Sequence, residues 1–382
     1  MLFRSVISVL QSDFLTQGPK INNFELEFAK YVGSKYAVAV SNGTAALHLA
    51  TLALGLKQGD KVITTPITFA ATANCIKYCG GEVVFSDIDS KTYLLDIAKV
   101  RILLESAPKG TYKGIIPVDF AGRAVNLEEF KNLAKEYNLW IIEDACHAPG
   151  GHYFDSSNSI QKCGSSKFSD LSIFSFHAVK HITTGEGGMI TTNDPKLYQK
   201  LLELRTHGIT KEPKNFVNNL FFANSELNEN SYPGWYMEMQ TLGFNYRITD
   251  FQAALGITQV KRANDGLVRR RYIAKKYNDE FSDQNFLKGH SGFIEGHAYH
   301  LYIIEIENRL GLYNYLKKHN ILTQVHYIPC HLMPYYKELG WKEGDLPNAE
   351  NYYKSCLSIP MFPSISDDEI NFVIKTIKDF YE

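Results

Sequence analysis

The chain has 382 residues, 45% of them hydrophobic, which is enough to bury the cores of two packed domains. Its 40 Lys and Arg side chains almost balance 41 Asp and Glu, so the formal net charge is -1. This balance provides no basic field for nucleic acid or for an anionic membrane, and we expect neither partner. An anionic ligand must instead be held by a local pocket.

The six cysteines lack the paired Cys-x-x-Cys spacing of a structural zinc site. We therefore expect free thiols in a reducing compartment and no bound metal. The first ten residues are apolar, but they lack the charged start, long hydrophobic region and cleavage site of a secretory signal. No apolar run reaches the roughly 18 residues that a membrane span needs. These features predict a cytoplasmic protein.

Strand-like and helical segments alternate through the first two thirds of the chain. Nearly continuous apolar strands in such an alternation predict a mainly parallel sheet covered on both faces. Ligands of these sheets bind beyond the carboxyl ends of the strands, where Thr65, Asp119, Asp144 and Ser175 are expected. The predicted strands are 36–40, 61–65, 82–87, 114–119 and 139–144, and predicted helices include 45–54, 69–78 and 127–137.

The last third of the chain has a different pattern. A polar, Asn-rich stretch at 211–232 predicts a long surface excursion, and 249–281 predicts a long helix that joins two domains. The segments 300–306 and 322–327, with helices that include 367–381, predict a smaller mixed domain. We therefore divide the chain into a large domain at 1–250 and a small C-terminal domain at 251–382.

Lys180 and Asp144 are the candidate catalytic residues. Lys180 follows the apolar run 172–176, and Asp144 closes another predicted strand. An amine that forms a Schiff base and an anion that keeps a pyridine nitrogen protonated are the pair that a pyridoxal phosphate enzyme needs. The alternatives are a solvated lysine and an aspartate that caps a turn. A solvated lysine does not ordinarily follow such an apolar run, and His147 supplies an imidazole that can reach the phenolic oxygen of the ring.

Three further features suit a phosphorylated ring. At 41–45 a predicted strand ends and a helix begins, so free N–H groups at Gly43 and Thr44 favour an anion. The same turn is equally consistent with an ordinary helix cap. Ser175 can donate a hydroxyl hydrogen bond to a phosphate. The ring of Phe69 can stack on the pyridine face, or it can simply belong to the core.

These blocks resemble those of a known family. The segments 41–45, 143–147, 175–188, 242–247 and 252–256 are similar to the signature blocks of the nucleotide-sugar aminotransferases, the DegT/StrS group of fold type I pyridoxal phosphate enzymes. The resemblance covers nearly the whole chain. It implies an α/β fold like that of aspartate aminotransferase, with a mainly parallel seven-stranded sheet in the large domain and a smaller α+β C-terminal domain.

The resemblance also implies roles for single residues around pyridoxal 5'-phosphate. Lys180 carries the imine, Asp144 pairs with the ring nitrogen, His147 contacts the phenolic oxygen and Phe69 stacks on the ring. The residues that hold the phosphate are Gly43, Thr44 and Ser175, joined by Asn245 from a neighbouring subunit. A homodimer with shared active sites is therefore expected.

The implied substrates are glutamate as amino donor and a UDP-linked 4-keto sugar that receives the amine on carbon 4. The segments 14–19, 235–240 and 324–329 resemble family members of pseudaminic acid biosynthesis. The resemblance places Leu15, Thr16, Gln17, Gly18, Gln324, Val325, His326, Tyr327 and Tyr336 along the sugar-nucleotide cleft. Arg205 and Arg247 are candidates for the donor carboxylates. Relatives carry further residues before the first helix, and any substrate contact from that stretch is expected to be absent.

Three alternatives remain open. The first is amination of a different nucleotide-linked keto sugar by the same mechanism. Related sugar dehydratases replace the Schiff-base lysine with histidine; Lys180 argues against that activity, although His177 and His181 flank it. A non-catalytic regulatory protein that retains the fold is the third alternative, and no basic recognition helix supports it.

Overall fold

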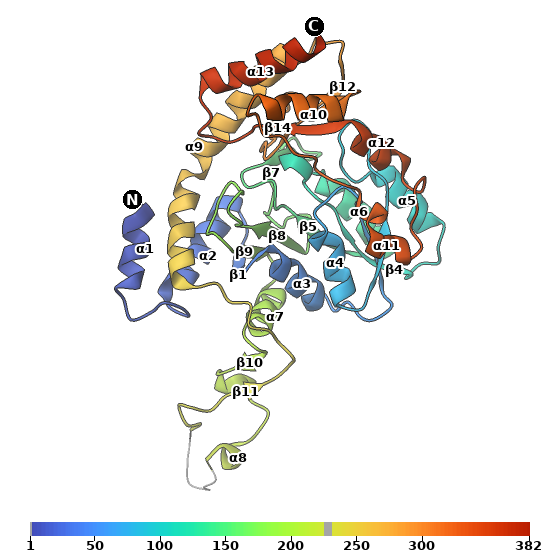
Figure 1. The fold of residues 1–382 in the computed structure, drawn as a ribbon. Coiled ribbons are helices and arrows are strands. Elements are labelled where there is room, and N and C mark those ends of the chain that lie inside the picture. Colours follow the sequence, from blue (N-terminus) through green and yellow to red (C-terminus); the bar gives the residue numbers. More distant parts are fainter. Residues whose placement is uncertain (1, 225–230) are drawn as a thin grey trace.

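A seven-stranded sheet forms the centre of the protein (Figure 1), for which a computed structural model describes residues 2–224 and 231–382. The strand order is β1-β9-β8-β5-β4-β2-β3. β9 runs antiparallel to both neighbours, whereas all other pairs are parallel, so the predicted mainly parallel sheet is confirmed. The strands are β1 Tyr36–Val40, β2 Lys61–Thr64, β3 Glu82–Phe85, β4 Tyr112–Ile116, β5 Trp140–Asp144, β8 Leu171–Ser175 and β9 Gly188–Thr192.

Helices cover both faces of this sheet, because its strands bury side chains on both sides. In β1, Val38 and Val40 belong to one hydrophobic core with α3, whereas Ala37 and Ala39 belong to a second core with α2. Such continuous burial is the pattern of a covered parallel sheet. The helices of this part are α1 Leu2–Leu10, α2 Pro19–Val32, α3 Gly43–Ala53, α4 Ala71–Tyr78, α5 Ile97–Glu105, α6 Leu127–Tyr137 and α7 Pro195–Arg205, with a short 3-10 turn η1 at Phe120–Gly122.

The long helix α9, Asp250–Phe281, connects two hydrophobic cores (Figure 1). Its first half places Ala253 and Val260 in a core with Phe24 of α2, and its second half places Tyr277 and Phe281 in the C-terminal core. The expected joining helix at 249–281 is therefore present. The domain division at residue 250 stays a prediction, because α9 lies in both cores. Among the described residues, no helix is both long and apolar enough to cross a membrane.

The C-terminal part is built on a three-stranded antiparallel sheet, β12-β13-β14. The predicted element 300–306 is β13. The predicted element 322–327 is not a regular strand, since only Gln324 pairs with Ser358 of β14 before the chain turns toward the large sheet. The elements are β12 Leu287–His290, β13 Tyr302–Ile306, β14 Cys356–Ile359, α10 Arg309–Lys318, η3 Cys330–Leu332, α11 Pro334–Glu338, α12 Pro347–Ser355 and α13 Asp367–Tyr381.

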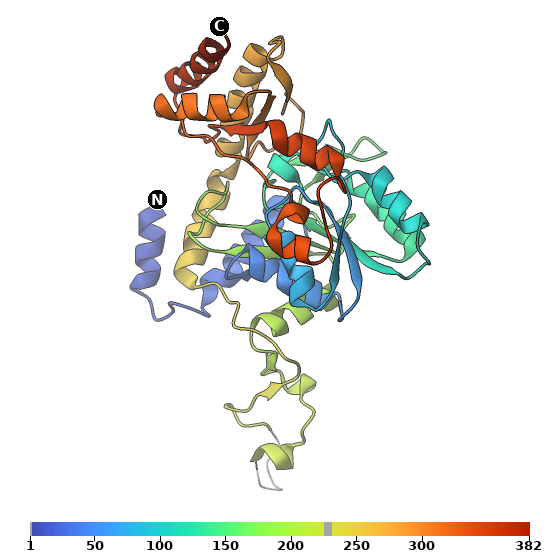
Figure 2. The same ribbon diagram turned by 45° about the vertical axis from the view of Figure 1, so that its right-hand side comes forward.

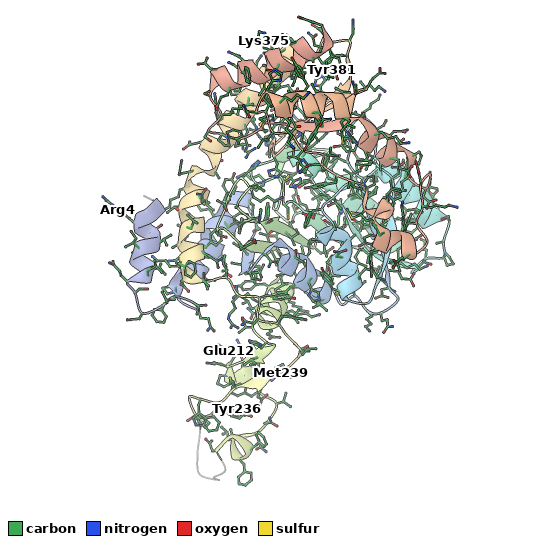
Figure 3. The ribbon with its side chains drawn as sticks, in the orientation of Figure 1. Arg4, Glu212, Tyr236, Met239, Lys375 and Tyr381 are labelled. Atoms are coloured by element: carbon green, nitrogen blue, oxygen red, sulfur yellow. The ribbon has the colours of Figure 1, made fainter. Side chains whose placement is uncertain are left out.

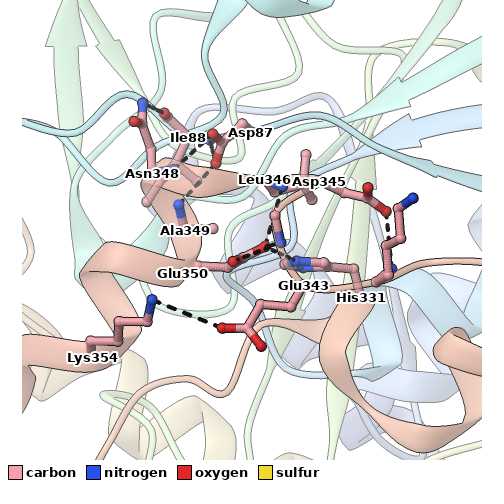
Figure 4. Close-up of polar contacts among 12 residues, drawn as sticks. Asp87, Ile88, His331, Glu343, Asp345, Leu346, Asn348, Ala349, Glu350 and Lys354 are labelled. Atoms are coloured by element: carbon pink, nitrogen blue, oxygen red, sulfur yellow. Dashed lines mark hydrogen bonds and ion pairs between the residues drawn. The ribbon is translucent and has the colours of Figure 1, made fainter.

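Helix α12 is fastened to the edge of the large sheet (Figure 4). Asp87, just beyond β3, accepts hydrogen bonds from the N–H groups of Asn348 and Ala349, both at 2.9 Å, and so caps the first turn of α12. Within α12, Glu350 lies 3.0 Å from the ring nitrogen Nε2 of buried His331. These contacts hold the segment that leads from the small sheet to the large one.

An arm formed by residues 209–224 and 231–240 projects away from the body of the protein (Figures 1 and 2). It contains β10 Ile209–Thr210, η2 Pro213–Asn215, α8 Leu220–Asn224 and β11 Glu238–Met239, and β10 pairs antiparallel with β11. The arm includes the predicted surface excursion at 211–232, of which 225–230 lie outside the described residues. A second small hairpin, β6 His152–Phe154 and β7 Ile160–Lys162, follows β5.

A buried aspartate anchors the segment between α1 and α2. Asp250, with no exposed surface, accepts hydrogen bonds from the N–H groups of Gly18 at 2.7 Å and Lys20 at 2.9 Å. Its own N–H donates to the carbonyl of Leu15 at 3.0 Å, and Thr16 pairs with Thr249. The start of α9 therefore sets the position of residues 15–18.

We expect Asp250→Ala to destabilise the protein by about 3 kcal/mol or more, because two N–H groups lose a charged acceptor and each such hydrogen bond is worth about 1.5–3 kcal/mol. Urea unfolding measures this free energy. Asp265→Ala is the matched control on an exposed position of the same helix, and we expect a change within about 0.5 kcal/mol. Equal losses for the two variants would contradict the anchoring role.

Candidate active site

The carboxyl ends of β1 and β8 and the start of β9 meet at one edge of the sheet. Val40 at the end of β1 is opposite Gly188, and Gly188 is opposite Ser175 at the end of β8. This register places the turn after β1 beside Ser175. A side-chain Cβ added at Gly43 would lie only 3.0 Å from the Cβ of Ser175. Any larger residue at 43 would force Ser175 to shift, so glycine suits this close approach.

The turn after β1 leaves hydrogen-bond donors free for an anion. Asn42 caps α3, and its Oδ1 accepts the N–H of Ala45 at 2.8 Å. The N–H groups of Gly43 and Thr44 lie in the first helical turn, where no intrahelical acceptor exists. Together with the Ser175 hydroxyl, these two N–H groups form a cradle that suits a phosphate group.

Lys180 lies in a turn five residues beyond the end of β8, rather than at the strand end itself. Its N–H donates to the carbonyl of His177 at 2.9 Å, and its side chain is half-buried. Burial lowers the pKa of the Lys180 amine, while the neighbouring Cys146 and Asp144 act in the opposite direction. The lowered pKa increases the fraction of neutral amine, the form that attacks a carbonyl carbon.

Asp144 is the last residue of β5 and is held by two hydrogen bonds. Its Oδ2 accepts the hydroxyl of Thr72 at 2.7 Å, and its Oδ1 accepts the N–H of Cys146 at 3.2 Å. The Thr72 hydroxyl lies 2.8 Å from that of Thr68. The prediction from sequence missed Thr72. Its spacing of four residues from Thr68, at the start of the predicted helix 69–78, was the available signal.

His147 faces the same space above Asp144. Its Nδ1 accepts the N–H of Ala121 at 3.3 Å, so a neutral ring carries its proton on Nε2, which lies 3.3 Å from the hydroxyl of Tyr327. Burial, together with the charges of Lys180 and His326, holds the pKa of His147 well below its usual value. A neutral His147 is therefore a hydrogen-bond donor toward this space.

Two aromatic side chains, Phe69 and Tyr327, lie near His147. The ring of Phe69 is 64% exposed, so it is available for stacking rather than buried in the core. Its centroid lies 6.5 Å from that of Tyr327, whose ring in turn stacks on His147 at 6.2 Å. The structure thus brings Phe69, His147 and Tyr327 together near Asp144.

The two predicted substrate segments lie beside different parts of this site. The exposed segment 15–18 is anchored at the start of α9, where Gln252 donates to the carbonyl of Glu186 at 3.0 Å. This contact connects the same helix end to the loop that follows Lys180. In the second segment, His326 Nδ1 lies 2.9 Å from the hydroxyl of Ser358. Burial and the charge of Lys180 lower the pKa of His326 to about 4.

Gln324 and Val325 precede His326 in this second segment. The N–H of Val325 donates to Oε1 of Gln324 at 2.9 Å. The Gln324 side chain is exposed at the surface. Tyr336 does not share this position. It is 2% exposed, its hydroxyl donates to Asn74 at 2.8 Å, and its ring packs 5.1 Å from that of Phe85. The described conformation therefore gives Tyr336 a core position with no surface for a substrate.

The remaining candidates, Arg205, Arg247 and Asn245, differ in whether their side chains already have partners within the protein. Arg205 is not free to hold a donor carboxylate, because its NH1 bonds to Glu25 at 2.5 Å and to the carbonyl of Ala39 at 2.9 Å. That expectation was wrong. Arg247 is half-buried and forms no ion pair within the described residues. Asn245 is exposed, and its side chain makes no hydrogen bond in the part of the chain that the structure describes.

These groups fit a flat, phosphorylated pyridine ring. The cradle at Gly43, Thr44 and Ser175 matches a phosphate, and the carboxylate of Asp144 matches a ring nitrogen. The half-buried amine of Lys180 lies within electrostatic reach of that carboxylate. An exposed aromatic face at Phe69 completes the fit.

Comparison with known proteins decides the family. A model of the DegT/DnrJ/EryC1/StrS aminotransferase family matches residues 2–378. The chain belongs to this family. Among curated relatives, the chain is 40% identical to the spore coat polysaccharide biosynthesis protein SpsC of Bacillus subtilis, over 98% of this chain and 93% of that protein. It is 37% identical to the UDP-4-amino-4,6-dideoxy-N-acetyl-beta-L-altrosamine transaminase of Campylobacter jejuni, over 99% and 94%.

Solved aminotransferase structures have the same fold. Helicobacter pylori PseC, an aminotransferase of pseudaminic acid biosynthesis, superposes with a TM-score of 0.85 at 29% identity, over 100% of this chain and 96% of that one. Bacillus subtilis NtdA with bound cofactor PMP, the amine form of pyridoxal phosphate, gives 0.83 at 25% identity, over 99% and 81%. The expected enzyme class, a pyridoxal phosphate-dependent sugar aminotransferase, and its cofactor are confirmed.

Proposed function

We propose that this aminotransferase moves an amino group from glutamate to carbon 4 of a UDP-4-keto-6-deoxy-N-acetylhexosamine, as part of pseudaminic acid biosynthesis. The observation that carries the reaction type is the pairing of Lys180 with Asp144 beside the phosphate cradle. The sugar assignment is supported by the similarity to the Campylobacter altrosamine transaminase and to PseC.

The chain supplies binding, orientation and proton transfer. When bound, pyridoxal phosphate provides a protonated ring that takes up the electron pair released at the carbon bearing the amine. Asp144, fixed by Thr72 and Cys146, would hold a proton on the ring nitrogen. Gly43, Thr44 and Ser175 would hold the phosphate, and His147 would donate from Nε2 to the phenolic oxygen. Phe69 covers one face of the ring.

Lys180 is the proposed base. Its Nζ would remove the proton from Cα of glutamate and pass it to the bound cofactor, and in the second half-reaction it would take a proton back from the cofactor and deliver it to carbon 4 of the sugar. The lowered pKa of Lys180 suits this role, because a base near the operating pH transfers protons most efficiently. The two half-reactions use one site in turn, so ping-pong kinetics are expected.

The segments 15–18 and 324–327 are the proposed walls of the sugar-nucleotide cleft. Segment 15–18 is bonded to the start of α9, which also contacts Glu186 through Gln252, and Tyr327 of the other segment lies 3.3 Å from His147. The exposed hydroxyl and amide groups of Thr16, Gln17 and Gln324, with the half-buried imidazole of His326, can bond to sugar hydroxyls. Arg247 stays a proposed contact for a donor carboxylate.

The substrate is tested with purified enzyme, glutamate and a panel of UDP-4-keto-6-deoxy-N-acetylhexosamines, with mass spectrometry and NMR of the product. We expect one amine on carbon 4 and an equal amount of 2-oxoglutarate. Amination of only GDP- or dTDP-linked keto sugars in a parallel panel would refute the UDP-sugar assignment while leaving the reaction type intact.

A second candidate is amination of a different nucleotide-linked keto sugar. The observation in its favour is the higher identity to SpsC, a spore coat polysaccharide protein, than to the altrosamine transaminase. The same panel separates the two candidates. A cytoplasmic location is also proposed, and the six free cysteines are consistent with a reducing compartment.

We further propose that the enzyme works as a homodimer in which Asn245 completes the phosphate shell of the partner site. The free amide of Asn245 is consistent with this role. The projecting arm carries exposed apolar side chains, including Trp235 at 71% and Met239 at 66% exposure. Tyr236 and Met239 lie on this arm (Figure 3). An apolar surface on an extended arm is typical of a contact with another protein chain.

Mixing two defective variants tests the shared site. We expect Lys180→Ala and Asn245→Ala to be weak alone at limiting cofactor, but to recover about a quarter of wild-type activity after unfolding and refolding together, since half of the symmetric dimers are then mixed and each has one intact site. The control mixes Lys180→Ala with Asp144→Ala, two residues of the same subunit's site. Recovery in the control, or none in the test mixture, would contradict the arrangement.

A further inference from the structure

A second group of buried ionisable side chains lies directly behind Asp144. Asp119 follows β4, Glu143 is the penultimate residue of β5, and Cys163 follows the β6–β7 hairpin. Each is 1% exposed, and their ligand atoms all lie within 4.8 Å of one another. Within the described residues, neither carboxyl forms an ion pair with a Lys or Arg side chain. Two ionised carboxylates in this space would repel each other strongly.

The two carboxyl groups have different hydrogen-bond environments. Glu143 accepts the hydroxyl of Ser172 at 2.5 Å and the N–H of Gly164 at 3.0 Å, which suits an ionised carboxylate. Asp119 Oδ1 accepts the N–H of Val125 at 2.8 Å. Asp119 Oδ2, by contrast, is shielded from solvent and has no nitrogen or oxygen donor among the described residues; beside it lie the Glu143 carboxyl and the Cys163 thiol, which is only a weak donor. A proton on Oδ2 would turn this oxygen into a donor toward Glu143.

We propose that Asp119 is a neutral carboxylic acid that shares its proton with Glu143 and positions His147 through the loop 119–125. Burial and the charge of Glu143 hold the pKa of Asp119 well above its usual value, which agrees with this assignment. The proposal depends on the proposed function only for the contact of His147 with the cofactor.

The backbone connects Asp119 to both cofactor contacts. Its N–H donates to the carbonyl of Asp144 at 3.0 Å, so the ends of β4 and β5 stay together. Its Oδ1 closes the loop at Val125, and the N–H of Ala121 within this loop donates to Nδ1 of His147. Asp119 is thus a positioning residue that determines which His147 nitrogen carries the proton. A neutral acid does so without placing another negative charge beside Asp144.

A proton explains this cluster better than a metal ion. The Glu143 carboxylate already accepts bonds from Ser172 and Gly164, so a cation would have to compete with both donors. A buried unpaired carboxylate oxygen needs only one donor, and a single proton supplies it.

Infrared spectroscopy of the cofactor-free protein at pH 7 tests the protonation directly. We expect a carbonyl band of a neutral carboxylic acid that shifts in D₂O and is lost in Asp119→Asn. The matched control is Asp155→Asn: hydrogen bonds from Ser157 and Ser159 hold the pKa of buried Asp155 below its usual value, so no such band is lost. The absence of the band from the wild type, or its loss only in Glu143→Gln, would overturn the proposal.

The positioning role is read from the ¹⁵N NMR spectrum of His147, without substrate. We expect Asp119→Asn to keep the wild-type Nε2–H tautomer, because the amide donates to Glu143 in place of the acid. Asp119→Ser, which is too short to reach Val125, should give a mixture of tautomers. An unchanged tautomer in Asp119→Ser would refute the positioning role. One equivalent of zinc or manganese in the purified protein would instead assign the cluster to a metal. Both measurements use protein without substrate, so failure of the aminotransfer proposal does not affect them.

Discussion

Lys180→Ala should abolish amino transfer, with a loss of at least about 10²- to 10⁴-fold, the range attributed to a positioned acid or base alone. Lys180 is the only lysine among the described residues of the site, and its half-buried amine has a lowered pKa. Stopped-flow measurement of each half-reaction gives the loss. The wild-type protein with cofactor should also show a visible absorption band that borohydride removes, and Lys180→Ala should lack the stable reduced adduct.

Two controls make this result specific. Lys318→Ala changes an exposed lysine on α10, and it should keep both activity and the reducible band. His181→Gln tests whether a neighbouring imidazole acts as base, as in the related dehydratases. Near-normal transfer by Lys180→Ala would remove Lys180 from the mechanism. A reducible band missing from the wild type would show that no Schiff base forms at Lys180.

Asp144→Asn should weaken cofactor binding at least about tenfold, because a charged hydrogen bond worth about 1.5–3 kcal/mol is replaced by a neutral one and each 1.4 kcal/mol is tenfold. The amide oxygen can still accept the Thr72 hydroxyl, so the fold should persist. Exchange of the glutamate Cα proton should slow about 10²-fold or more, since a ring without its nitrogen proton takes up electrons poorly.

Titration of the cofactor-free variant with pyridoxal phosphate measures the binding change, and proton NMR in D₂O measures the exchange. Asp283→Asn is the control, because Asp283 is exposed and lies outside the site. An unchanged exchange rate in Asp144→Asn would show that another group holds the ring nitrogen.

Much of the fold follows from local sequence pattern. Short apolar strands alternating with helices predicted the mainly parallel sheet, and β9 was the antiparallel addition that pattern alone did not mark. The site residues that end strands, Asp144 and Ser175, were recognisable because parallel strands share one ligand-binding edge. The turn at 41–45 was recognisable because a helix start leaves free N–H groups.

Contacts between distant segments were not predictable in this way. Arg205 looked free in sequence, yet it pairs with Glu25, 180 positions away. Tyr336 resembled a substrate contact, but it reaches Asn74 across the core. Thr72, which holds Asp144, was missed for the same reason. Each of these pairs forms only because packing brings distant segments together, and such pairs cannot be predicted from a single sequence.

The sequence by itself determined the residue types for cofactor chemistry, one lysine, one carboxylate and a glycine turn, because each follows a strand or begins a helix. Only the tertiary structure decided their surroundings: the half-burial of Lys180, the Thr72 bond to Asp144, the Ala121 bond to His147 and the paired acids behind them. The physical reason is that burial and hydrogen bonding depend on groups brought together from all parts of the chain, and these contacts decide which of the groups are charged.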